Sequence, residues 1–274
     1  LPPDGTVTVS ICDDGTDGKT KVMINEEFPA LRWNEGPRRG PAANRNLGAR
    51  LADGEWLIYL DDDCNPRPGF LAAYLREIKA LGSEARVALE GATHRTVAHP
   101  SLAWEAPDNR NGGALISCNF AIPRRLFLEC GGFDERYPTA FFEDTEFAVR
   151  LQIKGVKVVF VGDAIVDHPL RPLPEAAKLA RRWESRVVST YDFGASTRQL
   201  VWYLPRHIAL VILSRFRDRK LDRDNLRAAF VFMKEFLLTI WYLPGWLRKY
   251  RNAPRSPFWA DQIRLGNAPP RFGL

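Results

Sequence analysis

Three consecutive carboxylates, Asp61, Asp62 and Asp63, directly follow the apolar run from Trp56 to Leu60. The run is typical of a buried strand, so the carboxylates stand where a strand ends and a loop begins. On an extended segment residues i and i+2 point the same way, so Asp61 and Asp63 can converge while Asp62 turns away. Two converging carboxylates suit a Mg²⁺ or Mn²⁺ ion, which usually also keeps waters or phosphates as ligands. Acidic triplets also occur in solvated loops, and that alternative stays open here.

Two further groups could do chemistry. Glu143 and Asp144 follow two phenylalanines, and a carboxylate beside apolar surface can have its pKa raised and act as a general base. Acidic residues are also favoured in the first turn of a helix, and from these residues alone that interpretation is the stronger. His168 ends an apolar run and is a candidate metal ligand, although most single histidines are structural or exposed.

The elements that must position these residues follow from the periodicity. Apolar and β-branched runs predict strands, and apolar residues at helical spacing between charged ones predict helices. Strands are expected at 6–11, 55–60, 85–93 and 156–168, and helices at 42–51, 67–82, 123–133 and 143–155. Strands that alternate with helices indicate an α/β layer structure, in which ligands bind where strands end and loops begin.

The distribution of charge predicts two parts. Residues 1–170 contain 19 Lys+Arg and 25 Asp+Glu, a net −6, whereas residues 171–274 contain 20 and 8, a net +12. We therefore expect a domain at 1–170 and a basic, tryptophan-rich helical region at 171–274, with different partners. A basic region can meet nucleic acid, an anionic membrane surface or phosphorylated ligands. No nucleic-acid recognition motif accompanies the charge, so nucleic acid is not the expected partner.

Two apolar segments in the basic region, 199–213 and 228–247, raise the question of a membrane. Arg206 interrupts the first, and Lys234 and Glu235 interrupt the second, so neither is predicted to span a bilayer. Five of the eight tryptophans follow residue 171 among many arginines, a combination that suits helices lying in a membrane interface. A helical subdomain packed on the α/β core is the alternative, and the two are left open.

The cellular setting is predicted from the cysteines and the N-terminus. The four cysteines are scattered without a CxxC pair, so neither a disulfide framework nor a zinc site is expected. No basic stretch leads into an apolar core at the N-terminus, so no signal peptide is visible. We expect a cytoplasmic protein, peripheral at the inner face of the membrane, whose chain starts inside a longer protein because Leu1 is not Met.

The order of the motifs resembles one enzyme family. The segments "CDDGTDG", "RRGPAANRNLGA", "LIYLDDDCNP", "CGGFDE", "FFEDTEFAVRLQIKG" and "VDHP" follow one another between Val7 and Pro169. Each is weak alone, but in this order and spacing they resemble the family 2 glycosyltransferases. The resemblance implies a GT-A (Rossmann-like) fold, a mixed sheet flanked by helices, followed by the helical appendage.

The resemblance also implies roles for single residues. Asp13 and Asp14 match the acidic pair that contacts the donor nucleoside. Arg45 matches an arginine on a helix that lies near the nucleotide, and Asp61 and Asp63 match the DxD motif. In that motif Asp61 faces the ribose and Asp63 binds the divalent metal that bridges the diphosphate.

The later motifs supply the rest of the implied site. Asp144 matches the catalytic base and His168 a histidine that completes the metal site. The segment "GGALISCN" matches, less firmly, the lining of the donor-sugar and acceptor pocket. Candidate residues of that pocket are Gly113, Asn119, Glu143, Arg181 and Arg182, the two arginines as diphosphate contacts or, slightly favoured, as a basic helix face.

The implied function is an inverting, metal-dependent transfer of a sugar from a nucleotide-diphosphate sugar, a UDP-sugar, to a glycan or lipid-linked acceptor. Leu179 stands where processive members of the family carry the Gln of a Q-x-x-R-W motif, which indicates transfer of single sugars. The first strand of the family is not visible. Two alternatives are a sugar-1-phosphate nucleotidyltransferase, whose Gly-rich basic loop is not seen, and a non-catalytic carbohydrate- or membrane-binding protein with a degenerate transferase fold.

Overall fold

The computed structural model describes residues 7–97, 101–217, 219–220 and 222–266. It divides into two compact units. The first takes the described residues of Leu1–Thr96, Ala106–Glu135 and Glu143–Pro169, and the second those of Val97–Glu105, Arg136–Phe142 and Leu170–Leu274. The main boundary lies beside the expected one, but two short segments of the N-terminal half join the second unit. The functions expected of the two parts stay predictions.

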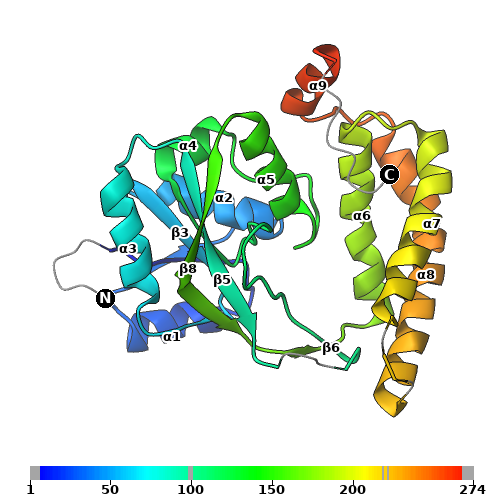
Figure 1. Ribbon diagram of the computed structural model, residues 1–274, viewed down its shortest axis with the longest axis horizontal. Helices are drawn as coiled ribbons and strands as arrows, with labels where there is room; N and C mark the ends of the chain where they lie inside the picture. The colour runs from blue at the N-terminus through cyan, green and yellow to red at the C-terminus, as the bar shows by residue number, and fades with distance from the viewer. Residues whose placement is uncertain (1–6, 98–100, 218, 221, 267–274) are drawn as a thin grey trace. The chain divides into compact units, whose positions relative to one another are not determined.

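A mixed five-stranded sheet forms the centre of the first unit (Figure 1). Its strands, in spatial order, are β3 (Trp56–Leu60), β7 (Asn119–Pro123), β5 (Val87–Arg95), β8 (Lys157–His168) and β4 (Asn65–Pro66). β5 and β8 are parallel, whereas β7 is antiparallel to both β3 and β5. Strands β3, β5 and β8 therefore run in one direction, and their carboxyl ends meet at the same edge of the sheet. The expected α/β mixed sheet is confirmed.

Helices cover both faces of this sheet. Helix α3 (Phe70–Leu81) packs Phe70, Ala73 and Tyr74 against one face. Helices α2 (Pro41–Leu51), α4 (Arg124–Glu129) and α5 (Glu143–Ile153) pack against the other. That second face holds a cluster of stacked and edge-on rings, Tyr59, Phe120, Phe127, Phe133 and Phe147. Phe147 of α5 belongs to this cluster, which thus packs α5 against the sheet.

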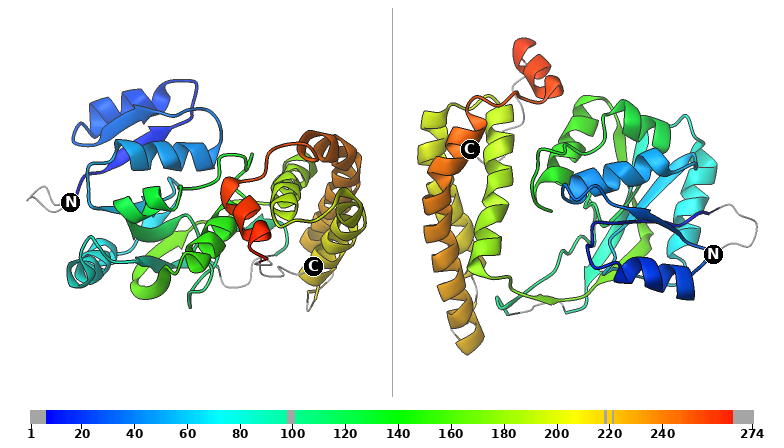
Figure 2. Two further views of the ribbon diagram at one scale, coloured as in Figure 1. Left: turned by 90° about the horizontal axis from the view of Figure 1, so that it is seen from above. Right: turned by 180° about the vertical axis from the view of Figure 1, so that it is seen from behind.

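A smaller parallel pair of strands, β1 (Ser10–Asp13) and β2 (Arg32–Glu35), precedes the central sheet, with α1 (Lys19–Glu27) between them (Figure 2). Residue 6 of the strand expected at 6–11 lies outside the described residues, and the strand found begins four residues and ends two residues later than expected. Neither α1 nor β2 was predicted. Only Ile24 of α1 is buried, and β2 reads RWNE without an apolar alternation, so neither element carries the periodicity that predicts it.

The end of α5 shows how the sequence sets an element boundary. Gly155 has φ 72°, a conformation that only glycine adopts at little cost. It lets Val156 N donate to Leu151 O over 2.9 Å and Gly155 N donate to Gln152 O over 3.0 Å, which satisfies carbonyls at the helix end. The helix expected at 143–155 thus ends where its glycine predicts.

Four helices make up most of the second unit: α6 (Ala176–Asp192), α7 (Thr197–Arg215), α8 (Arg223–Tyr250) and α9 (Pro257–Arg264). Helices α6, α7 and α8 lie side by side around their own apolar core (Figure 1). Two short strands, β6 (Trp104–Glu105) and β9 (Arg171–Pro172), pair with each other. Within the described ranges, no helix combines the length and the apolar character that crossing a bilayer requires.

Candidate active site

The metal-site residues predicted from the sequence lie together. Asp63 follows β3 and His168 ends β8, and because these strands end at one edge, Asp63 Oδ1 lies 3.4 Å from His168 Nε2. His168 is buried, and its Nδ1 lies 3.1 Å from the carbonyl oxygen of Pro169. A neutral imidazole that donates from Nδ1 presents the Nε2 lone pair to the carboxylate. Asp63 Oδ1 and His168 Nε2 are thus close enough for one cation to bind both of them.

Cys64 is a third group near this point, because the ligand atoms of Asp63, Cys64 and His168 all lie within 4.8 Å of one another. A hydrogen bond with Cys118 and burial raise the pKa of the Cys64 thiol strongly, so it stays protonated. Mg²⁺ and Mn²⁺ prefer oxygen ligands. Asp63 and His168 therefore fit such an ion, whose other positions would be left to phosphate oxygens and water.

Arg45 connects the two acidic motifs. It projects from α2, and its Nη2 donates to Asp61 Oδ1 over 2.8 Å while its Nη1 donates to Glu143 Oε1 over 3.0 Å. Burial works to lower the pKa of Arg45, but the charges of Asp61 and Glu143 raise it overall, so the guanidinium stays charged. One cation thus joins the carboxylates after β3 to those at the start of α5.

The two carboxylates at the start of α5 differ in access. Glu143 is 2 % exposed, and burial, together with the charge of Asp144, raises its pKa to about 7 against the opposing effect of Arg45. Asp144 is partly exposed, and burial also raises its pKa, although the hydrogen bond from the backbone N–H of Thr145 and the nearby N–H of Ser117 lower it. A carboxylate with a raised pKa suits a general base near neutral pH.

Asp13 and Asp14 stand at the carboxyl end of β1. Asp13 accepts from Gly15 N over 2.8 Å and Asp14 accepts from Arg38 N over 2.8 Å. The chain turns tightly here, since a Cβ on Gly36 would lie 2.2 Å from Asp14 Oδ1. Asn44 of α2 donates to Cys12 O over 2.7 Å, so the helix that carries Arg45 also holds the end of β1.

Three of the predicted pocket residues are buried in the sheet or belong to the second unit. Asn119 is buried in the sheet, where its amide accepts from Tyr74 Oη over 2.7 Å and donates to two backbone carbonyls, and its place in the pocket lining stays a prediction. Arg181 and Arg182 belong to α6 of the second unit, and Arg182 forms a bidentate ion pair with Glu105 at 2.6 and 2.9 Å. Diphosphate contact by these arginines stays a prediction.

Two residues were missed from the sequence. Glu90, buried in β5, accepts from Gly113 N over 2.8 Å, and the backbone N–H of Ser117 lies near Asp144 and lowers its pKa. A charged residue among the small residues of "ALEGAT" was the one signal for Glu90. A backbone donor such as Ser117 leaves no signal in the sequence.

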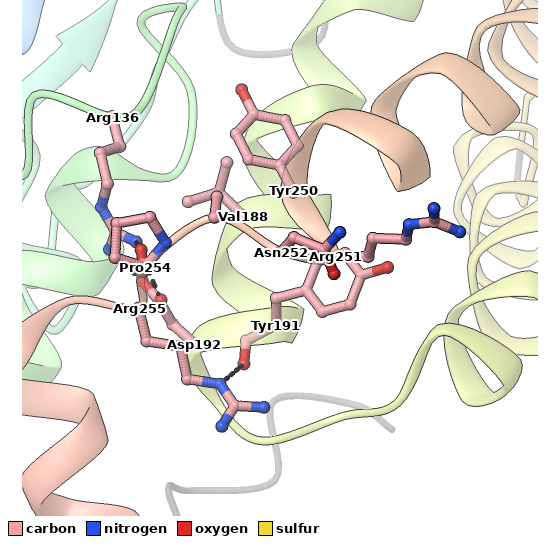
Figure 3. A pocket seen from close by; sticks show the side chains of 10 residues that line it. Arg136, Val188, Tyr191, Asp192, Tyr250, Arg251, Asn252, Pro254 and Arg255 are labelled. Carbon is pink, nitrogen blue, oxygen red and sulfur yellow. Dashed lines mark hydrogen bonds and ion pairs between the residues drawn. The ribbon is translucent and has the colours of Figure 1, made fainter.

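The second unit contains a pocket of about 280 Å³ (Figure 3). Its lining comes from α6, from the end of α8 and from the segment that follows α8. Within it Arg136 forms an ion pair with the buried Asp192, and Arg255 donates to Tyr191 O over 3.0 Å. None of the residues predicted for the active site lines this pocket.

Comparison with known proteins agrees with the geometry. Residues 3–88 match the family model "Glycosyl transferase family 2". An uncharacterized glycosyltransferase of Haemophilus influenzae is 27% identical over 157 residues, which cover 52% of this chain and 51% of that protein. Glycosyltransferase AglE of Haloferax volcanii is 24% identical over 95% of this chain and 75% of its own length. The chain thus spans about half of the Haemophilus relative.

Solved structures share the fold. The crystal structure of GalNAc-T7 with UDP, GalNAc and Mn²⁺ has a TM-score of 0.53 at 17% identity and covers 94% of this chain and 54% of that one. Staphylococcus aureus TarS in complex with UDP-GlcNAc has a TM-score of 0.52 at 14% identity, covering 94% and 83%. The predicted GT-A fold is therefore confirmed. Residues 3–88 thus match the family 2 glycosyltransferases, the curated relatives are glycosyltransferases, and the fold of the chain is GT-A.

Proposed function

We propose that the protein is an inverting, metal-dependent glycosyltransferase that moves a sugar from a nucleotide-diphosphate sugar to an acceptor hydroxyl. The observation that carries the proposal is the convergence of Asp63 with His168 and of Arg45 with Asp61 and Glu143 at one edge of the sheet. These residues come from four separate segments, and a fold gains little from bringing so many carboxylates together unless a ligand uses them.

The donor we propose is a UDP-sugar, used with Mn²⁺ or Mg²⁺. GalNAc-T7 was solved with UDP and Mn²⁺, and TarS with UDP-GlcNAc, which supports this class of donor for a chain of the same fold. Asp13 and Asp14, at the end of β1, and Asp61 would contact the nucleoside. Asp63 and His168 would hold the metal ion, which when bound neutralises the charge that develops on the leaving diphosphate.

Asp144 is the base that we propose for the acceptor. Glu143 is buried and bound by Arg45, whereas Asp144 is partly exposed and can meet an incoming hydroxyl. Taking the hydroxyl proton as attack begins is typically worth about 10²–10⁴-fold in rate. Attack from the side opposite the leaving diphosphate inverts the anomeric carbon and forms no covalent sugar–enzyme intermediate.

A donor screen tests the proposed reaction. Release of nucleotide diphosphate from UDP- and GDP-sugars is measured with Mn²⁺ and with a chelator, using simple glycosides and polyprenyl-phosphate sugars as acceptors. We expect metal-dependent release with at least one donor, and no pyrophosphate, which a nucleotidyltransferase would form or consume. Binding of a donor without release would favour the non-catalytic alternative, and release unaffected by the chelator would contradict the metal site.

For the second unit we propose docking on an anionic membrane surface, at its cytoplasmic face, where a lipid-linked acceptor would be met. Helix α8 exposes large apolar side chains at spacings of three and four residues, so they form one stripe. The stripe consists of Leu226, Phe230, Met233, Leu237 and Trp241, which are 47% to 80% exposed. The net charge of +12 on residues 171–274 supports an anionic surface as the partner.

Vesicle flotation tests this docking. The full chain is mixed with vesicles of phosphatidylglycerol and phosphatidylcholine, and the double variant Phe230→Ser, Trp241→Ser is compared with it. We expect the variant to float less, and both proteins to float less at high salt. Equal flotation of variant and wild type would contradict docking through the α8 stripe. Glu77→Gln, a surface change in the first unit, serves as the control.

A further inference from the structure

Glu90 is a buried carboxylate whose partners all come from one loop. It lies in β5 and is 2 % exposed. Its oxygens accept from Asn109 Nδ2 over 2.6 Å and from the backbone N–H groups of Gly113, Ala114 and Leu115 over 2.7–2.8 Å. Within the described part of the chain no cation pairs with it. Three successive N–H groups thus supply most of what compensates this charge.

The loop has the backbone shape that such an anion requires. Gly112, Gly113 and Leu115 all have positive φ, at 79°, 97° and 39°. A residue of positive φ beside one of negative φ turns their N–H groups toward one side, and Ala114, which is not among the residues of positive φ, stands between Gly113 and Leu115. The three N–H groups thus form a concave anion-binding nest. Leu115 has a side chain and is buried, so this backbone conformation is unfavourable for it and persists only because its surroundings impose it. The anion that this nest binds is the carboxylate of Glu90.

The same loop leads to the proposed base. Two residues beyond Leu115, the backbone N–H of Ser117 lies near enough to the carboxylate of Asp144 to lower its pKa. The loop is therefore held at one end by Glu90 and adjoins Asp144 at the other. We propose that Glu90 is a positioning residue for Asp144, acting through the loop of residues 113–117. The inference rests on the proposed role of Asp144 as base, but the positioning itself does not depend on turnover.

The consequence for Asp144 follows from the groups around it. Glu143 and Arg45 are the charged groups that face it, the N–H group of Thr145 donates to it, and the N–H group of Ser117 lies close to it. A nearby N–H group stabilises the charged form and lowers a carboxylate pKa, so Ser117 opposes the effect of burial. If the loop moves away, this effect weakens and the pKa of Asp144 rises.

Glu90→Gln tests the proposal with little change of shape. Glutamine replaces one acceptor oxygen by an NH₂ group. Because this NH₂ group is a donor, it cannot accept from the N–H groups of the loop, and hydrogen bonds are lost. We expect faster hydrogen exchange at residues 113–117 and, by ¹³C-carboxyl NMR, titration of Asp144 at higher pH than in wild type. With a donor that the enzyme turns over, kcat is expected to fall about tenfold or more with the donor KM unchanged, and its acidic limb to move to higher pH.

Glu129→Gln, the same chemical change at the surface of the first unit, is the control. If Glu90→Gln does not fold, Glu90→Asp keeps the charge but is too short to reach all three N–H groups, and the same changes are expected at smaller size. A folded variant that is merely less stable, with wild-type exchange at Ser117 and wild-type titration of Asp144, overturns the proposal. Absence of turnover in wild type would instead count against the proposed function, since the NMR and exchange results stand without it.

Discussion

Replacing Glu143 by glutamine is expected to change how the stability of the first unit depends on pH. Glu143 is 2 % exposed, and burial with the charge of Asp144 raises its pKa from 4.5 to about 7, although Arg45 works against this. Glutamine keeps the size and can still accept the hydrogen bond from Arg45, but it does not titrate. The variant therefore isolates the free energy of ionising a buried carboxyl group.

The sign and size follow from proton linkage. Between its unfolded pKa of 4.5 and its folded pKa of about 7, the folded state keeps a proton that the unfolded state has lost. Stability therefore falls as pH rises through this window, and the loss is complete above the folded value. Integrating a single site with these two values gives a loss of about 2.5 kcal/mol between about pH 5 and pH 8. Glu143→Gln removes this loss.

Urea unfolding of wild type and Glu143→Gln at the two pH values measures the effect. The free energy of unfolding of the variant relative to wild type is expected to rise by about 2.5 kcal/mol on going from the lower to the higher pH. Glu129→Gln is the matched control, since Arg86 and Arg125 lower the pKa of that surface carboxyl and it does not titrate in this window. A difference between variant and wild type that is the same at both pH values would refute the raised pKa of Glu143.

Three further predictions concern the residues around this carboxyl pair. Arg45→Met leaves two carboxylates without their cation, so we expect it to lower the free energy of unfolding at neutral pH by about 3 kcal/mol, measured by urea unfolding; an effect below about 1 kcal/mol would contradict the bridging role. His168→Ala is expected to weaken Mn²⁺ binding at least about tenfold in isothermal titration, because one of two protein ligands is lost; unchanged affinity would place the ion elsewhere. Of the substitutions Asp61→Asn, Asp62→Asn and Asp63→Asn, the middle one is expected to reduce turnover least, and another ranking would mean that the predicted convergence of the outer two is wrong.

A helix or strand is predicted from the sequence when its apolar residues repeat at the spacing at which its side chains are buried. Helix α3 and strand β8 were predicted within a few residues, because their apolar side chains repeat at the helical and extended spacings. Strand β7, "NFAIP", was not predicted as a strand. All five of its residues are buried in the middle of the sheet, so it shows no polar alternation, and its pairing with β3 and β5 decides its conformation.

The site was predicted in its residue types but not in its connections. The spacing of Asp61 and Asp63 and the position of His168 at a strand end were enough to predict an acidic edge with a histidine. The contact of Arg45 with Glu143 joins residues 98 positions apart, and the packing of α2 against the sheet creates it, so no local pattern predicts it. The hydrogen bonds of the buried Asn119 amide to Tyr74 and to the Ala164 carbonyl likewise join residues far apart in the chain, so no local pattern predicts them.

Asp144→Asn tests the central claim most directly. Asparagine keeps the shape and can still accept the hydrogen bond from Thr145 N, but it cannot take a proton. With a donor that wild type turns over in the presence of Mn²⁺, the account predicts that the variant loses at least about 10²-fold in kcat while its affinity for the nucleotide diphosphate, measured by titration calorimetry, stays at the wild-type value. Near-normal turnover by this variant, with an inverted anomeric centre in the product, would show that another group is the base and would contradict the account.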